Sequence, residues 1–384
     1  MRWLLFFTSG FFVIYHYLLY PAAAILLSRR KAVSVPASSS GDDSALPPVT
    51  LLIAAYNEAN VIEHKLCNSL ALDYPRAKLE ILVVSDGSSD ETPNIIASFA
   101  AQGVRSLFEP ERRGKTAALN RGVELASGEI VVFSDANNDF GLNAIRLLVR
   151  HFNDARVGGV SGAKKIYMDA DRESAVGDGL YWRYESALKQ AESRLGCITA
   201  ADGEIFAIRR HLFRPINPVL INDDAAITLN LVQNGYRVLY EPEAHSFEHA
   251  SIHIEDDFHV KVRMVAGGFQ TLFHYWRFLL LPRSWFAFAF LSHKVLRWLM
   301  PIFLIAFAVA SLSLYERRLG QISITAQLLF YGLAIAGWRQ RRAGALPNYL
   351  YIPFYFCTMN MAALLGLIRF LSGSQTTLWR KAQR

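Results

Sequence analysis

Carboxylates and amides follow an apolar run near the middle of the chain. The segment 128–140 reads Gly-Glu-Ile-Val-Val-Phe-Ser-Asp-Ala-Asn-Asn-Asp-Phe. Its apolar residues 130–133 predict a strand of a parallel sheet that is covered on both faces. Ligands of such sheets bind in the crevice beyond the carboxyl ends of the strands. Asp135 therefore lies where a bound metal ion or phosphate group is expected.

Three further polar motifs follow predicted strands, at 54–58, 85–90 and 113–116. Each motif alone has an ordinary structural explanation: Asp-Gly-Ser forms turns, Lys115 suits a solvated helix, and Asp135 can cap the helix that follows it. The carboxyl ends of parallel strands, however, meet at one edge of the sheet. We therefore expect all four motifs to form one site.

The sequence Gly114-Lys115-Thr116 invites comparison with a phosphate-binding P-loop. That motif requires a glycine five residues before Gly114, where this chain has Glu109. A P-loop is therefore excluded. A lysine at the start of a helix, beside a divalent cation held by a carboxylate, still suits a diphosphate.

The elements that carry these motifs alternate in type. Strands are predicted at 49–55, 79–85, 104–108, 129–134 and 237–240. Helices are predicted at 58–70, 89–101, 115–126, 174–193 and 225–234, the last closed by Gly235 at its C-cap. Strand, helix and strand at this spacing indicate crossover connections and an α/β fold.

Composition indicates a soluble domain carried on membrane helices. The chain has 384 residues, of which 52% are hydrophobic, and a mean hydropathy of +0.19. A membrane-spanning helix needs about 20 apolar residues. Runs of spanning or near-spanning length are 3–27, 284–314, 322–338 and 349–371. A cleaved signal peptide is the alternative for the first run, but Arg29-Arg30-Lys31 follows at once, which favours a retained helix.

The net charge of +7 concentrates in basic clusters beside the apolar runs, at 29–31 and 339–342. Such clusters orient membrane helices, so nucleic acid is not an expected partner. The first cluster predicts that the domain after the first helix is cytoplasmic. We expect a transmembrane helix in 1–31, a linker in 32–48, a cytoplasmic domain in 49–281, about three membrane helices in 282–371 and a basic tail in 372–384.

Four spans would place the cluster 339–342 inside and the basic tail outside, and the positive-inside rule disfavours an outside tail. A re-entrant or interfacial segment between Leu272 and Trp298 would remove the conflict. The sequence leaves both topologies open.

The motifs occur in an order that resembles a known enzyme family. They are Ala55-Tyr56-Asn57-Glu58, Asp86-Gly87-Ser88-Ser89-Asp90, Gly114-Lys115-Thr116-Ala117-Ala118-Leu119-Asn120, Ser134-Asp135-Ala136-Asn137 and Asn222-Asp223-Asp224. This series is similar to the inverting glycosyltransferase family 2, and within it to the membrane-embedded cellulose, hyaluronan and poly-N-acetylglucosamine synthases. The resemblance covers 49–281 and implies a glycosyltransferase domain of the nucleotide-diphospho-sugar transferase (GT-A) fold, an α/β domain with a Rossmann-like mixed sheet.

The resemblance also implies roles for residues at matching positions. Tyr56 and Glu58 would line the nucleoside pocket, Asp86 would bind the nucleobase, and Lys115 would face the diphosphate. Asp135 and Asn137 would hold Mg²⁺ or Mn²⁺, and Asp224 would be the general base. Asp202 and Glu204 fall where the family binds its acceptor, and Lys261 and Arg263 are candidate contacts of the acceptor or the diphosphate.

These roles imply an inverting displacement. Asp224 would take the proton of the acceptor hydroxyl as this attacks the anomeric carbon from the face opposite the diphosphate. The metal ion would neutralise charge that develops on the leaving diphosphate. Asp223 is expected to raise the pKa of Asp224 by like-charge repulsion. Both aspartates also suit the first turn of a helix, which is compatible with this role.

Two positions depart from the family pattern. Asn137 stands where the family has the second aspartate of Asp-x-Asp, so the metal is held by less charge unless Asp139 contributes. Residues 261–268 stand where processive synthases have Gln-x-x-Arg-Trp, and they lack the tryptophan on which an acceptor sugar stacks. Lys261 and Arg263 also suit a basic helix face at the membrane. Processive synthesis is therefore left open.

The resulting expectation is a multi-pass inverting glycosyltransferase of the cell membrane. It would transfer a hexose or N-acetylhexosamine from a nucleotide sugar, with UDP as the expected nucleotide, to a glycan acceptor, as in exopolysaccharide synthesis. Its partners would be the nucleotide sugar, a glycan or lipid-linked acceptor, and membrane lipids. One alternative is a single-addition enzyme that makes a polyprenyl-phosphate sugar or glycolipid. Another is a catalytically weak membrane protein that binds nucleotide sugars.

Overall fold

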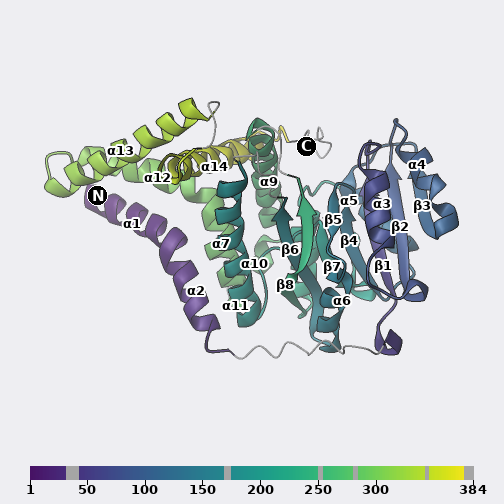
Figure 1. The fold of residues 1–384 in the computed structure, drawn as a ribbon. Helices are drawn as coiled ribbons and strands as arrows, with labels where there is room; N and C mark the ends of the chain where they lie inside the picture. The colour runs from purple at the N-terminus through teal and green to yellow at the C-terminus, as the bar shows by residue number, and fades with distance from the viewer. Residues whose placement is uncertain (32–42, 168–173, 250–253, 280–283, 342–345, 376–384) are drawn as a thin grey trace.

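The structure is a computed structural model that describes residues 1–31, 43–167, 174–249, 254–279, 284–341 and 346–375. The predicted basic tail from residue 376 onward and most of the predicted linker lie outside the described residues. Within the described part, an eight-stranded sheet lies beside a group of long apolar helices (Figure 1).

The sheet is mixed. Its strands are β1 Val49–Ala55, β2 Leu79–Asp86, β3 Val104–Glu109, β4 Ile130–Asp135, β5 Asn138–Phe140, β6 Val157–Ile166, β7 Ile205–Arg209 and β8 Arg237–Glu248, in the spatial order β3-β2-β1-β4-β7-β6-β8-β5. β1 pairs in parallel with β2 and β4, β2 with β3, and β6 with β8. β7 runs antiparallel to β4 and β6, and β5 runs antiparallel to β8. The predicted α/β class with a mixed sheet is confirmed.

The second half of the sheet contains more strand than the hydrophobic pattern predicts. β8 continues past Tyr240 to Glu248, although Pro242 interrupts its alternation. The register between β6 and β8 shifts between Ser161 and Ala163, opposite this interruption. A bulge of this kind accommodates residues that a regular ladder excludes, including proline.

Helices accompany the sheet on both faces. They are α3 Ile62–Leu70, α4 Thr92–Ser98, α5 Lys115–Leu125, α6 Ala144–Val149, α7 Ser174–Leu195, α8 Asp223–Gln233, α9 Ile254–His274 and α10 Trp276–Leu279. The prediction that α3 begins at Glu58 is wrong. Asn57 adopts a φ of +51°, and the backbone N–H groups of Val61 and Ile62 both donate to the Glu58 carbonyl, so a turn precedes the helix.

The central strands are buried on both faces. Leu51 and Ile53 of β1 point into a core that includes α3, α4 and α6, and Leu52 points into a second core with α5 and α8. Phe286 and Phe290, from the apolar helix α11 (Trp285–Phe290), belong to this second core. Burial on both faces explains why these strands read as continuous apolar runs. The second core also attaches the apolar helices to the sheet.

Four helical segments are long and apolar enough to cross a membrane: Arg2–Ser28, Trp285–Ser313, Arg318–Gln340 and Asn348–Leu371. The first comprises α1 Arg2–Ile14, a π-helical turn and α2 Tyr20–Ser28. The second comprises α11 Trp285–Phe290, a π-helical turn at Leu291–Val295 and α12 Leu296–Ser313, and the others are α13 and α14. In Figure 1, α1, α12, α13 and α14 extend away from the sheet, and α7, α9, α10 and α11 stand between.

Candidate active site

The carboxyl ends of β1, β2 and β4 lie level with one another. In the register of the sheet, Ala54 pairs with Asp135, and Ala55 pairs with Ser85. β1 and β4 are neighbours in space, although β2 and β3 separate them in the sequence. Ligands of α/β proteins bind at such a switch point. The motifs that we expected to form one site therefore begin at one edge of the sheet.

The turns that follow β1 and β2 are joined by hydrogen bonds. The backbone N–H of Asn57 donates to Oγ of Ser88 at 3.1 Å, and that of Glu58 donates to Oγ1 of Thr92 at 2.7 Å. Tyr56 and Glu58 are half-buried in this arrangement. Both predicted nucleoside-binding residues are thus held beside the loop that follows β2.

Arg112 lies over the ring of Tyr56, with 3.7 Å between the guanidinium carbon and the ring centroid. Gly87 makes room for this pair, because a Cβ there would lie 2.7 Å from Cβ of Arg112. A planar cation stacked on an aromatic ring gives a flat wall suited to a nucleobase. Arg112 is not among the predicted residues, although the basic pair before Gly114 was a usable signal.

Asp86, at the end of β2, holds the loop that leads into α5. Its Oδ2 accepts hydrogen bonds from the backbone N–H groups of Arg113 and Gly114, at 3.0 and 2.6 Å. Its Oδ1 accepts from Nη2 of Arg121 at 2.5 Å. Gly114 has a φ of +93°, which favours glycine there. Asp86 thereby positions the start of α5, and its contact with a nucleobase stays a prediction.

Lys115 opens α5 and directs its ammonium group at Asp135. Its Nζ lies 2.6 Å from Oδ1 of Asp135 and 3.9 Å from Oδ2 of Asp223. Burial alone would lower the pKa of Lys115, but Asp135 and Asp223 together raise it above its usual value. A charged Lys115 therefore joins the end of β4 to the start of α8.

Asp223 and Asp224 form the first turn of α8, as their sequence suggests. Asp224 lies against the loop before β7, since a Cβ at Gly203 would lie 3.2 Å from Cβ of Asp224. Burial, and secondarily the charge of Asp223, raise the pKa of Asp224 to about 7. The expected repulsion by Asp223 is present, but burial is the larger cause. A carboxylate with this pKa can accept a proton near neutral pH.

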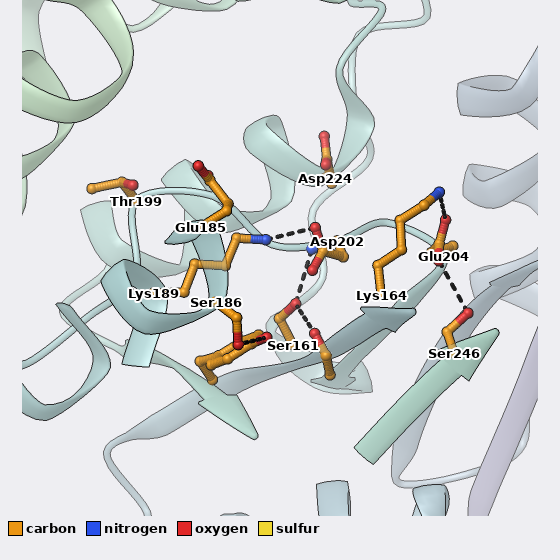
Figure 2. Close-up of polar contacts among 12 residues, drawn as sticks. Ser161, Lys164, Glu185, Ser186, Lys189, Thr199, Asp202, Glu204, Asp224 and Ser246 are labelled. Atoms are coloured by element: carbon orange, nitrogen blue, oxygen red, sulfur yellow. Dashed lines mark hydrogen bonds and ion pairs between the residues drawn. The ribbon is translucent and has the colours of Figure 1, made fainter. Parts of the chain in front are cut away.

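Asp202 and Glu204, the predicted acceptor residues, have different surroundings (Figure 2). Nζ of Lys189 lies 2.6 Å from Oδ1 of Asp202, and Figure 2 shows Asp224 next to this pair. Glu204 is only 8% exposed and accepts hydrogen bonds from Lys164 at 2.7 Å and from Ser246 at 3.0 Å. Of the two, Asp202 lies next to Asp224, and contact of either residue with an acceptor stays a prediction.

Asn137 follows β4 and donates a hydrogen bond from Nδ2 to Oε1 of Glu248 at 2.9 Å. Asp139, the predicted auxiliary ligand, instead accepts from His64 and Tyr167, each at 3.0 Å. Among the described residues, no group of three or more His, Cys, Asp or Glu side chains is arranged to hold a metal ion. Magnesium-type ions commonly use one or two protein oxygens and complete their shell with water and phosphates. Asp135, whose Oδ1 pairs with Lys115, and Asn137, whose Nδ2 is held by Glu248, carry oxygens of this kind.

Helix α9 covers the site from the side of the apolar helices. Nδ2 of Asn222 donates to the Met264 carbonyl at 2.9 Å, and Gly267 permits this approach because a Cβ there would lie 2.6 Å from Oδ1 of Asn222. Burial lowers the pKa of Arg263, while the charges of Asp223, Asp135 and Asp224 oppose this shift. The guanidinium group of Arg263 therefore interacts electrostatically with the carboxylates of the site. Lys261 is half-buried on the same helix.

A second group of buried charges connects α7 to the apolar helices. Glu185 accepts hydrogen bonds from Lys294 at 2.7 Å and from Arg297 at 3.0 Å, and Nδ1 of His293 lies 2.7 Å from Oε1 of Glu192. Burial raises the pKa of Glu185, but the charges of Arg297 and Lys294 outweigh it and hold this pKa well below its usual value. α7 also carries Lys189, which binds Asp202. The sequence offered one sign of this charged cluster, namely the ionisable residues inside the apolar run 284–314.

Comparison with known proteins identifies a family for the part of the chain that carries most of this site. Residues 50–216 match the family model for glycosyl transferase family 2. The chain carries a glycosyl transferase family 2 domain. This domain spans β1 to β7, and therefore includes Tyr56, Asp86, Lys115 and Asp135.

Curated relatives of the family 2 domain are named poly-beta-1,6-N-acetyl-D-glucosamine synthase. The protein of Staphylococcus aureus (strain MSSA476) is 29% identical over 232 residues, which are 58% of this chain and 55% of the relative. The protein of Staphylococcus epidermidis is 28% identical over the same length. The chain thus spans about half the length of these relatives.

A solved structure is similar across almost the whole chain. The mannosyltransferase PcManGT from Pyrobaculum calidifontis, in complex with GDP-Man and Mn²⁺, has a TM-score of 0.73 and 24% sequence identity. The match covers 96% of this chain and 99% of that protein. The fold around the family 2 domain is accordingly that of GT-A glycosyltransferases, as predicted.

Proposed function

We propose that the chain is a membrane-bound inverting glycosyltransferase. It transfers a hexose or an N-acetylhexosamine from a nucleotide sugar to a glycan acceptor, as in exopolysaccharide synthesis. The observation that carries the proposal is the position of Asp224 in the first turn of α8, beside Asp223 and the Lys115–Asp135 ion pair. Burial, and secondarily Asp223, raise the pKa of Asp224 there to about 7. A base with this pKa removes a proton from an acceptor hydroxyl efficiently near neutral pH.

Each part of the site has a task in this reaction. The wall of Tyr56 and Arg112 holds the nucleobase, and the charges of Lys115 and Arg263 attract the diphosphate. Asp224 accepts the proton of the acceptor hydroxyl, whose oxygen attacks the anomeric carbon from the face opposite the diphosphate, so the configuration inverts. Mg²⁺ or Mn²⁺, when bound to Asp135 and Asn137, neutralises charge on the leaving diphosphate.

The similar proteins support two sugar classes. The curated relatives are named for a polymer of N-acetyl-D-glucosamine, whereas the similar solved structure holds GDP-Man and Mn²⁺. We propose a divalent metal on this basis and keep UDP as the expected nucleotide, with GDP as its competitor. The four apolar helices support a multi-pass membrane location, and Arg29-Arg30-Lys31 supports a cytoplasmic domain.

Single addition to a lipid-linked acceptor is the second candidate function. It is favoured by residues 261–268, which lack the tryptophan of processive synthases. Within this stretch, Gly268 faces the indole of Trp298, since a Cβ there would lie 2.5 Å from the ring. An acceptor sugar therefore has no stacking platform from this stretch of α9.

Purified full-length protein, incubated with UDP-glucose, UDP-N-acetylglucosamine and GDP-mannose with and without Mn²⁺, tests the proposal. We expect metal-dependent release of the nucleoside diphosphate from one of them. A polymer ladder among the products supports polysaccharide synthesis, and one lipid-extractable product supports single addition. Binding of a nucleotide sugar without release in any arm contradicts the proposal and favours a catalytically weak binding protein.

A further inference from the structure

We propose that Glu248 is a positioning residue of the metal site, which orients the side-chain amide of Asn137 so that its oxygen serves as the ligand. The inference rests on the proposed function, because it concerns the metal that Asp135 and Asn137 would hold. It also accounts for the asparagine that replaces the family's second aspartate. Glu248 lies at the end of β8, more than a hundred residues after Asn137 in the sequence.

The contacts of Glu248 leave it no direct access to a ligand. Its side chain is 4% exposed. Oε1 accepts the hydrogen bond from Nδ2 of Asn137 at 2.9 Å, and Oε2 forms an ion pair with Nζ of Lys164. Lys164 is itself shared with Glu204, at 2.7 Å. Glu248 therefore acts through Asn137 and does not touch a cation itself.

A carboxylate fixes the orientation of an amide because an ionised carboxylate only accepts hydrogen bonds. The NH₂ group of Asn137 must face Glu248, so the planar amide turns Oδ1 to the opposite side. Within the described part of the chain, this Oδ1 accepts no hydrogen bond. It is the one side-chain atom of Asn137 that can ligate a hard cation. Partners of this kind tune metal affinity by about 10–100-fold in other metal sites.

The same contact explains why aspartate is disfavoured at this position. An Asn137→Asp substitution would set two carboxylates about 3 Å apart, and their repulsion would oppose ionisation of both. Asn137 and Glu248 together carry one negative charge. Asn137→Asp combined with Glu248→Gln keeps that charge and reverses the hydrogen bond. The new amide at 248 then donates to the carboxylate at 137, and its oxygen accepts from Lys164.

The single substitution Glu248→Gln has a different effect. The amide oxygen of the new glutamine is needed to accept the hydrogen bond from Lys164, so the NH₂ group of this glutamine must face Asn137. Asn137 then has to rotate its amide and present Oδ1 to this NH₂ group. The ligand oxygen is lost, although no residue that touches the cation has changed. Both single variants should therefore bind metal more weakly than wild type, for different reasons.

The test is a double-mutant cycle on the full-length protein with two readouts. The first is Mn²⁺ affinity in the presence of UDP or GDP, measured from the electron paramagnetic resonance of free Mn²⁺. The second is the thermal unfolding temperature without metal. We expect each single variant to lose about tenfold or more in Mn²⁺ affinity and to unfold at a lower temperature. The double variant should recover both quantities.

Glu204→Gln is the matched control, because it removes the other carboxylate of Lys164 without touching Asn137. Combining it with Asn137→Asp should rescue neither readout. The inference is overturned if the double variant is no better than the worse single variant, or if Asn137→Asp alone binds Mn²⁺ more tightly than wild type. Failure of rescue in a protein whose wild type binds Mn²⁺ and turns over leaves the proposed function intact. A wild type that binds no Mn²⁺ overturns both.

Discussion

Replacing Asp223 with asparagine should move the acid limb of the pH–rate profile to lower pH. Asp224 must be ionised to act as a base, so kcat/KM falls as the pH drops through the pKa of this residue. That pKa is raised from 3.8 to about 7, with burial as the first cause and the Asp223 charge as the second. Removing the Asp223 charge should therefore lower the pKa of Asp224, and a lowering by about one pH unit is enough for the test.

A shift of this size has a measurable effect on the rate. At about pH 6, Asp224 would be ionised in about 10% of wild-type molecules and in about half of Asp223→Asn molecules. The rate at that pH, relative to the plateau at high pH, should therefore rise about fivefold. Loss of Asp223 also leaves Lys115 less neutralised, which stabilises ionised Asp224 in the same direction.

The assay is nucleoside diphosphate release as a function of pH, at saturating metal, for wild type and variant. Asp73→Asn is the control, because Asp73 is an exposed carboxylate that pairs with Arg146 on the surface. It should leave the acid limb in place. An acid limb that stays in place, or moves to higher pH, in Asp223→Asn would refute the electrostatic account of Asp224.

Three further predictions concern other parts of the structure. Glu185→Gln removes the buried carboxylate that pairs with half-buried Lys294 and Arg297, and should cost about 3–5 kcal/mol of unfolding free energy. Exposed Glu111→Gln should cost under about 1 kcal/mol, and equal melting temperatures for the two variants would contradict this. Gly128→Ala should lower the free energy of unfolding by about 1–3 kcal/mol, because the new Cβ would lie 2.4 Å from the Thr50 backbone nitrogen. In the control Gly332→Ala the new Cβ has no atom within 4 Å, so this variant should unfold like wild type. Tyr56→Ala should weaken nucleotide binding in calorimetry by about 1–3 kcal/mol, and unchanged affinity would remove Tyr56 from the nucleobase wall.

Much of the fold follows from local sequence patterns. The run Val49–Ala55 is apolar throughout because β1 is buried on both faces, and its bounds agree with the prediction. Gly235 ends α8 with a φ of +84°, as its position after the helix suggests. β7 was harder to place, since its antiparallel pairing with β4 depends on residues far apart in the chain. The hydrophobic periodicity of β7 does not indicate which distant strand it pairs with.

The site was predictable to a similar extent. Asp135, Lys115 and Asp224 stand in ordered motifs, and the crossing of parallel strands brings such motifs to one edge. Glu248 and Lys189 carry no motif, and their roles arise only when β8 and α7 fold against the loops of the site. Burial of Asp224 is likewise a tertiary property. The sequence shows the neighbouring charge of Asp223 but not the burial of Asp224. Burial, the larger cause of the raised pKa of Asp224, could therefore not be predicted.

The central claim is that Asp224 is the base of an inverting glycosyl transfer. The most direct test compares wild type with Asp224→Asn, which preserves size while removing the proton acceptor. Nucleoside diphosphate affinity, measured by calorimetry, should stay close to that of wild type, while transfer to the acceptor should fall by about 100-fold or more. Asp224→Asn that keeps full turnover with the same nucleotide sugar would contradict the claim.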